Sequence, residues 1–175
     1  MTVIVVTGVM AAGKSTVAQR LAEALPRSAH VRGDVFRRMI VSGRVEMAPG
    51  DPAGADDQLW LRYRLSAAAS DAYAQSGFTT IVQDVILGTD VPRYLGLLRT
   101  RPRHLVVLAP SRATVAAREA RRAKSGYGDW TVEALDAVLR DETPRIGLWL
   151  DTSDESPAET VERILSRLPE ARITD

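Results

Sequence analysis

The sequence predicts an α/β domain in which a parallel sheet of about five strands lies between two layers of helices, a three-layer, doubly wound arrangement. Short runs rich in β-branched residues recur along the chain, and each is followed by a segment with helical spacing of its apolar residues. Several of these runs are apolar at nearly every position, as in parallel strands that are buried on both faces. Strands that alternate with helices favour a parallel sheet, and 175 residues are enough for one domain spanning 1–175.

The first strand and the first helix flank the most distinctive stretch of the chain. The apolar run 2–6 is followed by a G-x-x-x-x-G-K-[ST] motif. In such a loop the backbone N–H groups surround a phosphate, the lysine reaches the β- and γ-phosphate oxygens, and the hydroxyl ligates Mg²⁺. The alternative is a glycine-rich turn that binds no ligand. The residues predicted to bind nucleotide here are Gly8, Val9, Met10, Ala11, Ala12, Gly13, Lys14, Ser15 and Thr16.

The helix after this motif supports the phosphate-binding interpretation. Val17, Leu21 and Leu25 form one apolar face before Pro26 ends the helix. The positive end of its dipole lies next to the expected phosphate. The chain has 23 Lys and Arg residues, of which only Lys14 and Lys124 are lysines. Because arginine supplies nearly all other positive charge, a lysine at this position indicates a specific requirement.

A second strand is expected at 28–32, followed by Gly33, Asp34 and a helix over 35–41. Asp34 therefore follows the carboxyl end of a strand, where the ligand crevice of an open α/β sheet lies. This placement predicts that Asp34 faces a substrate. Aspartate is also a preferred helix N-cap, and the two roles are compatible.

The segment 42–57 contains Pro and Gly residues without a steady period, so we expect a loop on the acceptor side of the site. A helix is expected over 58–75, where apolar residues recur at helical spacing. Trp60 and Tyr63 on this helix are candidates for lining a substrate pocket. The alternative for both side chains is packing in the hydrophobic core.

The third strand, expected at 78–83, leads directly into Asp84. A carboxylate after an apolar strand is typical of the residue that holds Mg²⁺ through water in proteins with a phosphate-binding loop. The same position can instead contact the phosphoryl acceptor. A third interpretation is an ordinary solvated aspartate at the start of a loop.

A further helix is expected over 91–100 and a buried strand over 104–109, and the helix 111–124 that follows is strongly basic. Arg118 and Arg122 lie four residues apart on one face of that helix, and Arg121 lies beside them. Gly126-Tyr127-Gly128 follows and offers a hinge, so we expect 111–130 to form a lid whose arginines stabilise charge on a γ-phosphate. The alternative is that the arginines form a basic helix face that contacts only solvent.

The remaining part of the chain predicts a helix over 131–140, a last strand over 146–150 and a final helix through 168. Ser156 and Glu159 have the spacing of a capping box, with Pro157 at the first helical position.

Composition excludes several classes of function. The net charge of +1 provides no large basic field for nucleic acid or membrane, although a local basic cluster would still permit a nucleic-acid substrate. With no Cys there is no thiol nucleophile, disulfide or zinc–thiolate site. The chain has no Asn, which excludes the Asn-Lys-x-Asp guanine motif and the Asn of the protein-kinase catalytic loop.

No apolar stretch is as long as a transmembrane helix or a signal peptide, so a cytoplasmic protein is expected.

With these residues assembled, the chain resembles the small P-loop kinases, the group of chloramphenicol phosphotransferase, gluconate kinase, shikimate kinase and the kinase domain of polynucleotide kinase. The resemblance is strongest to chloramphenicol phosphotransferase, and it spans nearly the whole chain. It is carried by the loop ending Ala12-Gly13-Lys14-Ser15, by the segment 83–88 and by the late pair Asp151-Thr152. It implies the P-loop nucleoside-triphosphate hydrolase/kinase fold, ATP and Mg²⁺ as cofactors, and phosphorylation of a hydroxyl group.

The resemblance also implies roles for individual residues. Asp34 falls where the family keeps its general base, and the loop around Asp151 and Thr152 contacts the adenine together with the lid. The acidic pair of the family at the third strand is Gln83-Asp84 in this chain, so one carboxylate is missing. Asp34 and Arg37 reproduce the Asp-x-x-Arg spacing of polynucleotide kinase.

These observations predict an ATP-dependent kinase that phosphorylates a hydroxyl of a small polar metabolite or antibiotic. One alternative is a kinase for nucleosides, nucleotides or the 5′-hydroxyl of polynucleotides. An alternative of another class is a nucleotide-dependent switch or binding module. The sequence specifies neither the acceptor nor the oligomeric state.

Overall fold

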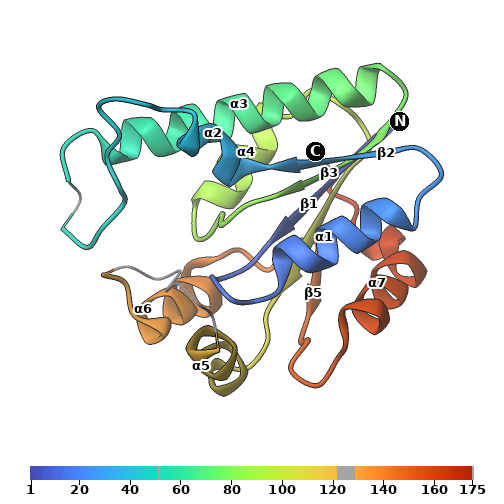
Figure 1. The fold of residues 1–175 in the computed structure, drawn as a ribbon. Helices are drawn as coiled ribbons and strands as arrows, with labels where there is room; N and C mark the ends of the chain where they lie inside the picture. Colours follow the sequence, from blue (N-terminus) through green and yellow to red (C-terminus); the bar gives the residue numbers. More distant parts are fainter. Residues whose placement is uncertain (51, 122–128, 175) are drawn as a thin grey trace.

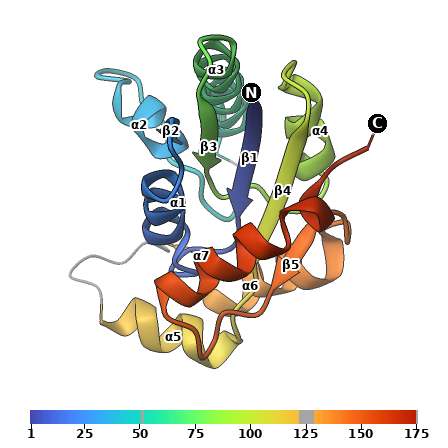
Figure 2. The ribbon, with the colours of Figure 1, turned by 90° about the vertical axis from the view of Figure 1, so that its right-hand side faces the viewer.

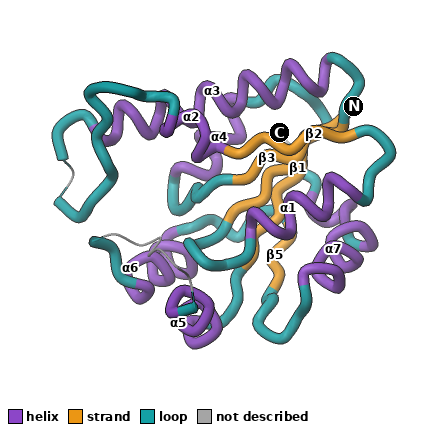
Figure 3. Tube along the Cα trace, viewed as in Figure 1, coloured by secondary structure: helices purple, strands orange, loops and turns teal. Residues whose placement is uncertain are grey.

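The computed structural model describes residues 1–50, 52–121 and 129–174, and it contains one parallel sheet of five strands. The strands have the order β2-β3-β1-β4-β5, so the predicted fold class is confirmed (Figure 3). The first strand along the chain occupies the centre of the sheet. The strands are β1 (Thr2–Thr7), β2 (Ser28–Arg32), β3 (Thr79–Gln83), β4 (Arg103–Leu108) and β5 (Leu148–Leu150).

Helices cover both faces of this sheet. One face packs against α1 and α7, and the other packs against α3 and α4 (Figures 1 and 2). Near the carboxyl ends of the strands lie α2, α5 and α6 (Figure 1). The helices are α1 (Lys14–Glu23), α2 (Gly33–Arg38), α3 (Ala55–Gln75), α4 (Asp90–Leu97), α5 (Arg112–Ala120), α6 (Val132–Ala137) and α7 (Pro157–Ser166), with a π-helical turn at Val138–Glu142 and a 3₁₀ turn at Leu168–Ala171.

The apolar composition of β1 explains its central position. Val3, Ile4, Val5 and Val6 are each at most 1% exposed, because helices cover both of their faces. In the register, Ile4 lies beside Ile81 of β3 on one side and beside β4 on the other. Burial of such a strand is the main contribution of the sheet to the hydrophobic core. In the described part of the chain, no helix has the length and apolar character needed to cross a bilayer.

Several helix boundaries differ from those expected. The long helix begins at Ala55 rather than at 58, because Gly54 adopts a left-handed conformation with φ of 82° and Pro52 O accepts the N–H of Ala55. Asp56 and Asp57 then lie in the first turn, where the helix dipole favours negative charge. The expected loop 42–57 is therefore shorter than predicted.

The helix expected over 35–41 ends at Arg38, and Val41 beyond it is 97% exposed, so no burial favours a further turn. The helix expected over 131–140 ends at Ala137 and continues as the π-helical turn, where the Thr143 hydroxyl donates to Val138 O. The basic helix expected over 111–124 ends at Ala120. Arg122 and the proposed hinge 126–128 lie outside the described residues.

Candidate functional site

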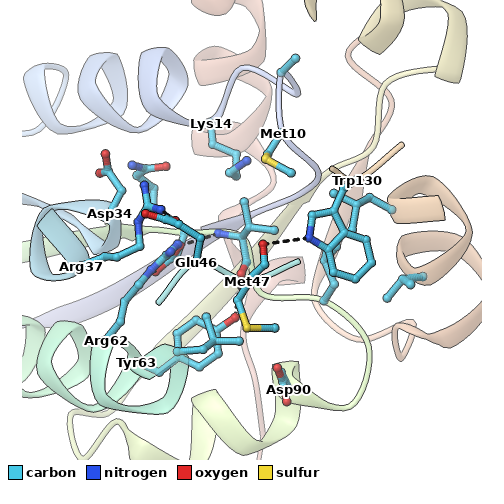
Figure 4. A pocket seen from close by; sticks show the side chains of 18 of the residues that line it. Met10, Lys14, Asp34, Arg37, Glu46, Met47, Arg62, Tyr63, Asp90 and Trp130 are labelled. Atoms are coloured by element: carbon cyan, nitrogen blue, oxygen red, sulfur yellow. Dashed lines mark hydrogen bonds and ion pairs between the residues drawn. The ribbon is translucent and has the colours of Figure 1, made fainter. Parts of the chain in front are cut away.

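A cleft of about 1060 Å³ lies where β1 and β3 end, which is the edge of the sheet where the sequence predicts the site. Five parts of the chain form its walls: the phosphate-binding loop, α2, the segment 45–48, α3 with the residues after β3, and α5 with α6 and the residues before it. Figure 4 shows Lys14 and Met10 on one side of the cleft, Asp34, Arg37, Glu46 and Arg62 together on a second side, and Trp130 opposite them.

The phosphate-binding loop passes through backbone conformations that favour glycine. Gly8 and Gly13 have φ of 147° and 95°, and Ala11 has φ of 61°. A Cβ at Gly8 would overlap the carbonyl oxygen of Leu108 on the neighbouring strand, so only glycine fits there. Lys14 is 8% exposed, and its Nζ donates to Val9 O at 2.7 Å.

The helix that follows presents the right groups to a phosphate. α1 starts from Gly13, which has no side chain to cap it, and the first N–H groups of a helix have no partner within the helix. Ser15 and Thr16 are exposed and line the cleft, together with Met10 and Ala11. These groups fit a polyphosphate, and the Ser15 hydroxyl is a suitable oxygen ligand for a magnesium ion. Among the described residues, no group of three or more His, Asp or Glu side chains is arranged to hold a metal by itself.

Arg118 reaches from α5 across the phosphate-binding loop. Its Nη2 donates to Thr152 O at 2.9 Å, and its Nη1 donates to Ala12 O at 3.3 Å. The guanidinium therefore lies over the loop and lines the cleft. Arg121 is exposed at the end of the same helix.

The pair Asp151-Thr152 follows the last strand and does not line the cleft. The Asp151 carboxylate accepts hydrogen bonds from the N–H and the hydroxyl of Ser153, which lower the pKa of Asp151. Thr152 is buried, and its carbonyl holds Arg118. Asp151 therefore stabilises the turn of this loop, and only Thr152 is connected to the phosphate-binding loop, through Arg118.

Asp34 lies in the first turn of α2 and lines the cleft. The N-cap of α2 is Arg32, so Asp34 does not cap the helix and its carboxylate is directed to other partners. Arg38 Nη2 donates to Asp34 Oδ2 at 2.5 Å, and Arg32 Nε lies 3.7 Å from Oδ1. The structure places Asp34 in the same cleft as Lys14, as a general base requires.

Asp84 is 2% exposed, so the interpretation as a solvated loop aspartate is wrong. Its carboxylate forms an ion pair with Arg62 of α3, whose Nε donates to Oδ2 at 2.7 Å and whose Nη2 contacts Oδ1. The N–H of Val85 donates to Oδ1 as well. Gly33 leaves the space for this carboxylate, because a Cβ there would overlap it.

Arg62 is a residue of the site that the sequence reasoning missed. Burial is the largest effect on its pKa and lowers it, and the charge of Arg37 lowers it further. The sequence gives no signal that separates Arg62 from Arg64, which flanks Tyr63 on the other side and is exposed.

Of the two aromatic candidates on α3, only one lines the cleft. The Tyr63 hydroxyl donates to Val85 O at 2.7 Å, and burial raises the pKa of this tyrosine. Trp60 packs edge-on against Tyr63 and stacks under the guanidinium of Arg93, 3.9 Å from the ring centroid, so it belongs to the packing of α3. Trp130, which the sequence reasoning did not single out, lines the cleft, and its Nε1 donates to Met47 O at 3.4 Å (Figure 4).

Comparison with known sequences assigns the family. A sequence family described as "AAA domain" matches residues 3–146, which include the phosphate-binding loop, Asp34 and the whole cleft wall from α2 to α6. The chain belongs to this family. No curated protein matches the sequence.

Three kinases are among the solved structures that have a similar fold. A sugar kinase from Janibacter sp. HTCC2649 is 25% identical with a TM-score of 0.71, and the match covers 98% of this chain and 96% of that one. A gluconokinase from Sinorhizobium meliloti 1021 is 22% identical with a TM-score of 0.67, covering 96% and 91%. The Mycobacterium tuberculosis APS kinase CysC in complex with AMPPNP and APS is 17% identical with a TM-score of 0.67, covering 96% and 97%. The resemblance to P-loop kinases that the sequence indicates is confirmed at the level of the fold.

Proposed function

We propose that this protein is an ATP-dependent phosphotransferase that moves the γ-phosphoryl group to a hydroxyl of a small polar molecule. The observation that carries the proposal is the single cleft shared by Lys14 of the phosphate-binding loop and the carboxylate of Asp34. The sugar kinase and gluconokinase among its structural neighbours support the same class of reaction.

Different residues of the cleft have different roles in this reaction. Asp34 orients the acceptor hydroxyl and accepts its proton while the hydroxyl oxygen forms a bond to the γ-phosphorus. The bond from that phosphorus to the β–γ bridging oxygen breaks, and its electron pair leaves with ADP. Lys14 and Arg118 stabilise the negative charge on the transferring group.

The magnesium site follows from the same arrangement. Ser15 would hold Mg²⁺ with its hydroxyl, beside phosphate oxygens and water, and the ion would supply charge neutralisation. The predicted metal role of Asp84 stays a prediction, because its carboxylate is bound by Arg62 in this structure. Arg122, also predicted to contact phosphate, lies outside the described residues.

The test is ADP release from Mg·ATP over a panel of sugars, sugar acids, nucleosides, 5′-hydroxyl oligonucleotides and antibiotics, with detection of the phosphorylated product. We expect one acceptor class to raise turnover well above the ATPase background. Removal of the charge at Lys14 by Lys14→Ala should lower kcat by about 10²–10³-fold. Asp34→Ala should lower it by about 10²-fold, the low end for a general base, because the transition state is loose.

Asp154→Ala is the matched control, since Asp154 is exposed and does not line the cleft. An ATPase that responds to no hydroxylated compound, while ATP still binds in a Lys14-dependent way, would contradict the kinase proposal and favour a nucleotide-dependent switch. Phosphorylation of an oligonucleotide alone would instead identify the acceptor as nucleic acid.

A further inference from the structure

One buried polar side chain of the cleft takes part in none of the contacts described above. Gln83, the last residue of β3, is 4% exposed and lines the cleft. Among the residues that the structure describes, none forms a hydrogen bond with its side-chain amide. Buried amides are nearly always hydrogen-bonded, because burial removes their bonds to water. An amide that faces a cleft without a partner from the chain is therefore suited to a ligand.

The other glutamine of the cleft, Gln58, is different. The N–H of Val45 donates to its Oε1 at 2.9 Å, and its Nε2 donates to Gly43 O at 2.8 Å. Both ends of this amide hold the segment that follows α2. Gln58 therefore has a structural role, whereas the donor and the acceptor of Gln83 stay available within the described part of the chain.

The order of the strands places Gln83 between the two partners of the proposed reaction. β3 lies between β2 and β1 (Figure 3), and Gln83 is in register with Arg32 of β2 and with Val6 of β1. Neighbouring strands are only about 4.8 Å apart. β1 leads into the phosphate-binding loop with Lys14, and β2 leads into Asp34. The Gln83 side chain therefore enters the cleft between the phosphate-binding loop and the proposed general base.

An amide at this position can act on a phosphoryl group in a way that a carboxylate cannot. The NH₂ group of glutamine donates two hydrogen bonds, whereas an ionised carboxylate only accepts them. Asp34, Glu46 and Asp84 already line this side of the cleft, and a further negative charge would repel an anionic phosphoryl group. A neutral donor instead stabilises the charge on phosphoryl oxygens and adds no repulsion.

We propose that Gln83 is a further catalytic residue, whose side-chain N–H donates a hydrogen bond to an oxygen of the γ-phosphoryl group as this group passes from ADP to the acceptor hydroxyl. The amide gains and loses no proton, because Asp34 takes the proton of the hydroxyl and the electron pair of the broken bond leaves with ADP. The proposal rests on the kinase function proposed above and adds a residue to its mechanism.

The experiment isolates the γ-phosphoryl group and needs no acceptor. Isothermal titration calorimetry measures the binding of Mg·ADP, of Mg·AMPPNP, and of Mg·ADP with aluminium fluoride, which imitates the transferring phosphoryl group. Gln83→Met keeps the length of the side chain and removes the donor, so it should weaken the aluminium fluoride complex about tenfold and AMPPNP about threefold. Gln83→Glu should weaken both about tenfold or more, because its charge faces the phosphoryl group. Mg·ADP should bind to the wild type and to both variants alike.

Gln75→Glu is the matched control, because Gln75 is exposed and outside the cleft, and this variant should bind all three ligands like the wild type. Unchanged affinities for AMPPNP and aluminium fluoride in both Gln83 variants would overturn the proposal. So would an equal loss of Mg·ADP binding, since that indicates a role in folding or in metal binding. A wild-type protein that binds none of the three nucleotides would refute the kinase function itself, whereas normal nucleotide binding with no effect at Gln83 refutes only this role.

Discussion

At the scale of single residues, the site depends on how closely two strand ends approach each other. Gly33 follows β2, Asp84 follows β3, and these two strands are neighbours in the sheet. The absence of a side chain at Gly33 leaves the space in which the Asp84 carboxylate meets Arg62. This contact joins α3 to the end of β3, and α2, which carries Asp34 and Arg37, lies against it at Gly33.

A methyl group at Gly33 tests this arrangement. Gly33→Ala should displace Asp84 and lower the free energy of unfolding by about 1–3 kcal/mol, as overpacking does in a well-packed interior. Urea unfolding gives the value. Gly96→Ala is the control, since nothing lies within 4 Å of its added Cβ within α4, and alanine there should stabilise by about 0.5–1 kcal/mol. Equal effects at the two glycines would show that the space at Gly33 is not required.

At the scale of elements, the sequence predicted those helix and strand boundaries that depend on neighbouring residues in the chain. The boundaries of β2 agree with the prediction at both ends, and the capping box of α7 is present, with Ser156 and Glu159 bonded to each other's backbone N–H groups. The early start of α3 was missed, although Asp56 and Asp57 were a signal for it. The pairing of Glu46 with Arg37 was not predictable, because a loop without periodicity gives no information about which distant side chains it meets.

The cap of α7 gives a prediction of its own. Ser156→Ala removes the hydroxyl that accepts the N–H of Glu159, so the free energy of unfolding should fall by about 0.5–2 kcal/mol. Thermal and urea denaturation measure this. Ser166→Ala serves for comparison, since its exposed hydroxyl only donates to Arg163 O near the end of the same helix. If both serines prove equally dispensable, the capping box does not stabilise α7.

At the scale of the whole molecule, the sheet determines where the site lies and the side chains determine what it binds. The motif, the parallel sheet with helical connections and the placement of Asp34 after the end of a strand were predicted from the sequence, whereas the spatial order of the strands was not. The charge of the acceptor side did not follow, because Arg37, Arg62 and Glu46 come from three separate elements. Only the folded chain brings them to one wall.

The two histidines make global stability depend on pH. Burial lowers the pKa of both His30 and His104 below the ordinary value of 6.5, so the unfolded chain takes up protons more readily than the folded one. Their stabilising contribution is complete above pH 6.5 and is lost as the pH falls through their folded pKa values. We expect the free energy of unfolding in urea to decrease from pH 7.5 to pH 5.5.

A variant that carries both His30→Gln and His104→Gln should show a flatter profile over the same interval. The chain has only these two histidines, so few other groups titrate there. A wild-type protein that becomes more stable as the pH falls over this interval would contradict the expectation.

The central position of β1 also bears on how the chain is made. A ribosome completes β1 first, yet its two neighbours in the sheet are β3 and β4, and β4 ends only at Leu108. At about 5–20 residues per second, roughly 5–20 s pass before both partners exist. During that time an almost wholly apolar strand is uncovered on the nascent chain. We therefore expect β1 to be the principal target of ribosome-associated chaperones on the nascent chain, and its release to follow the synthesis of β4.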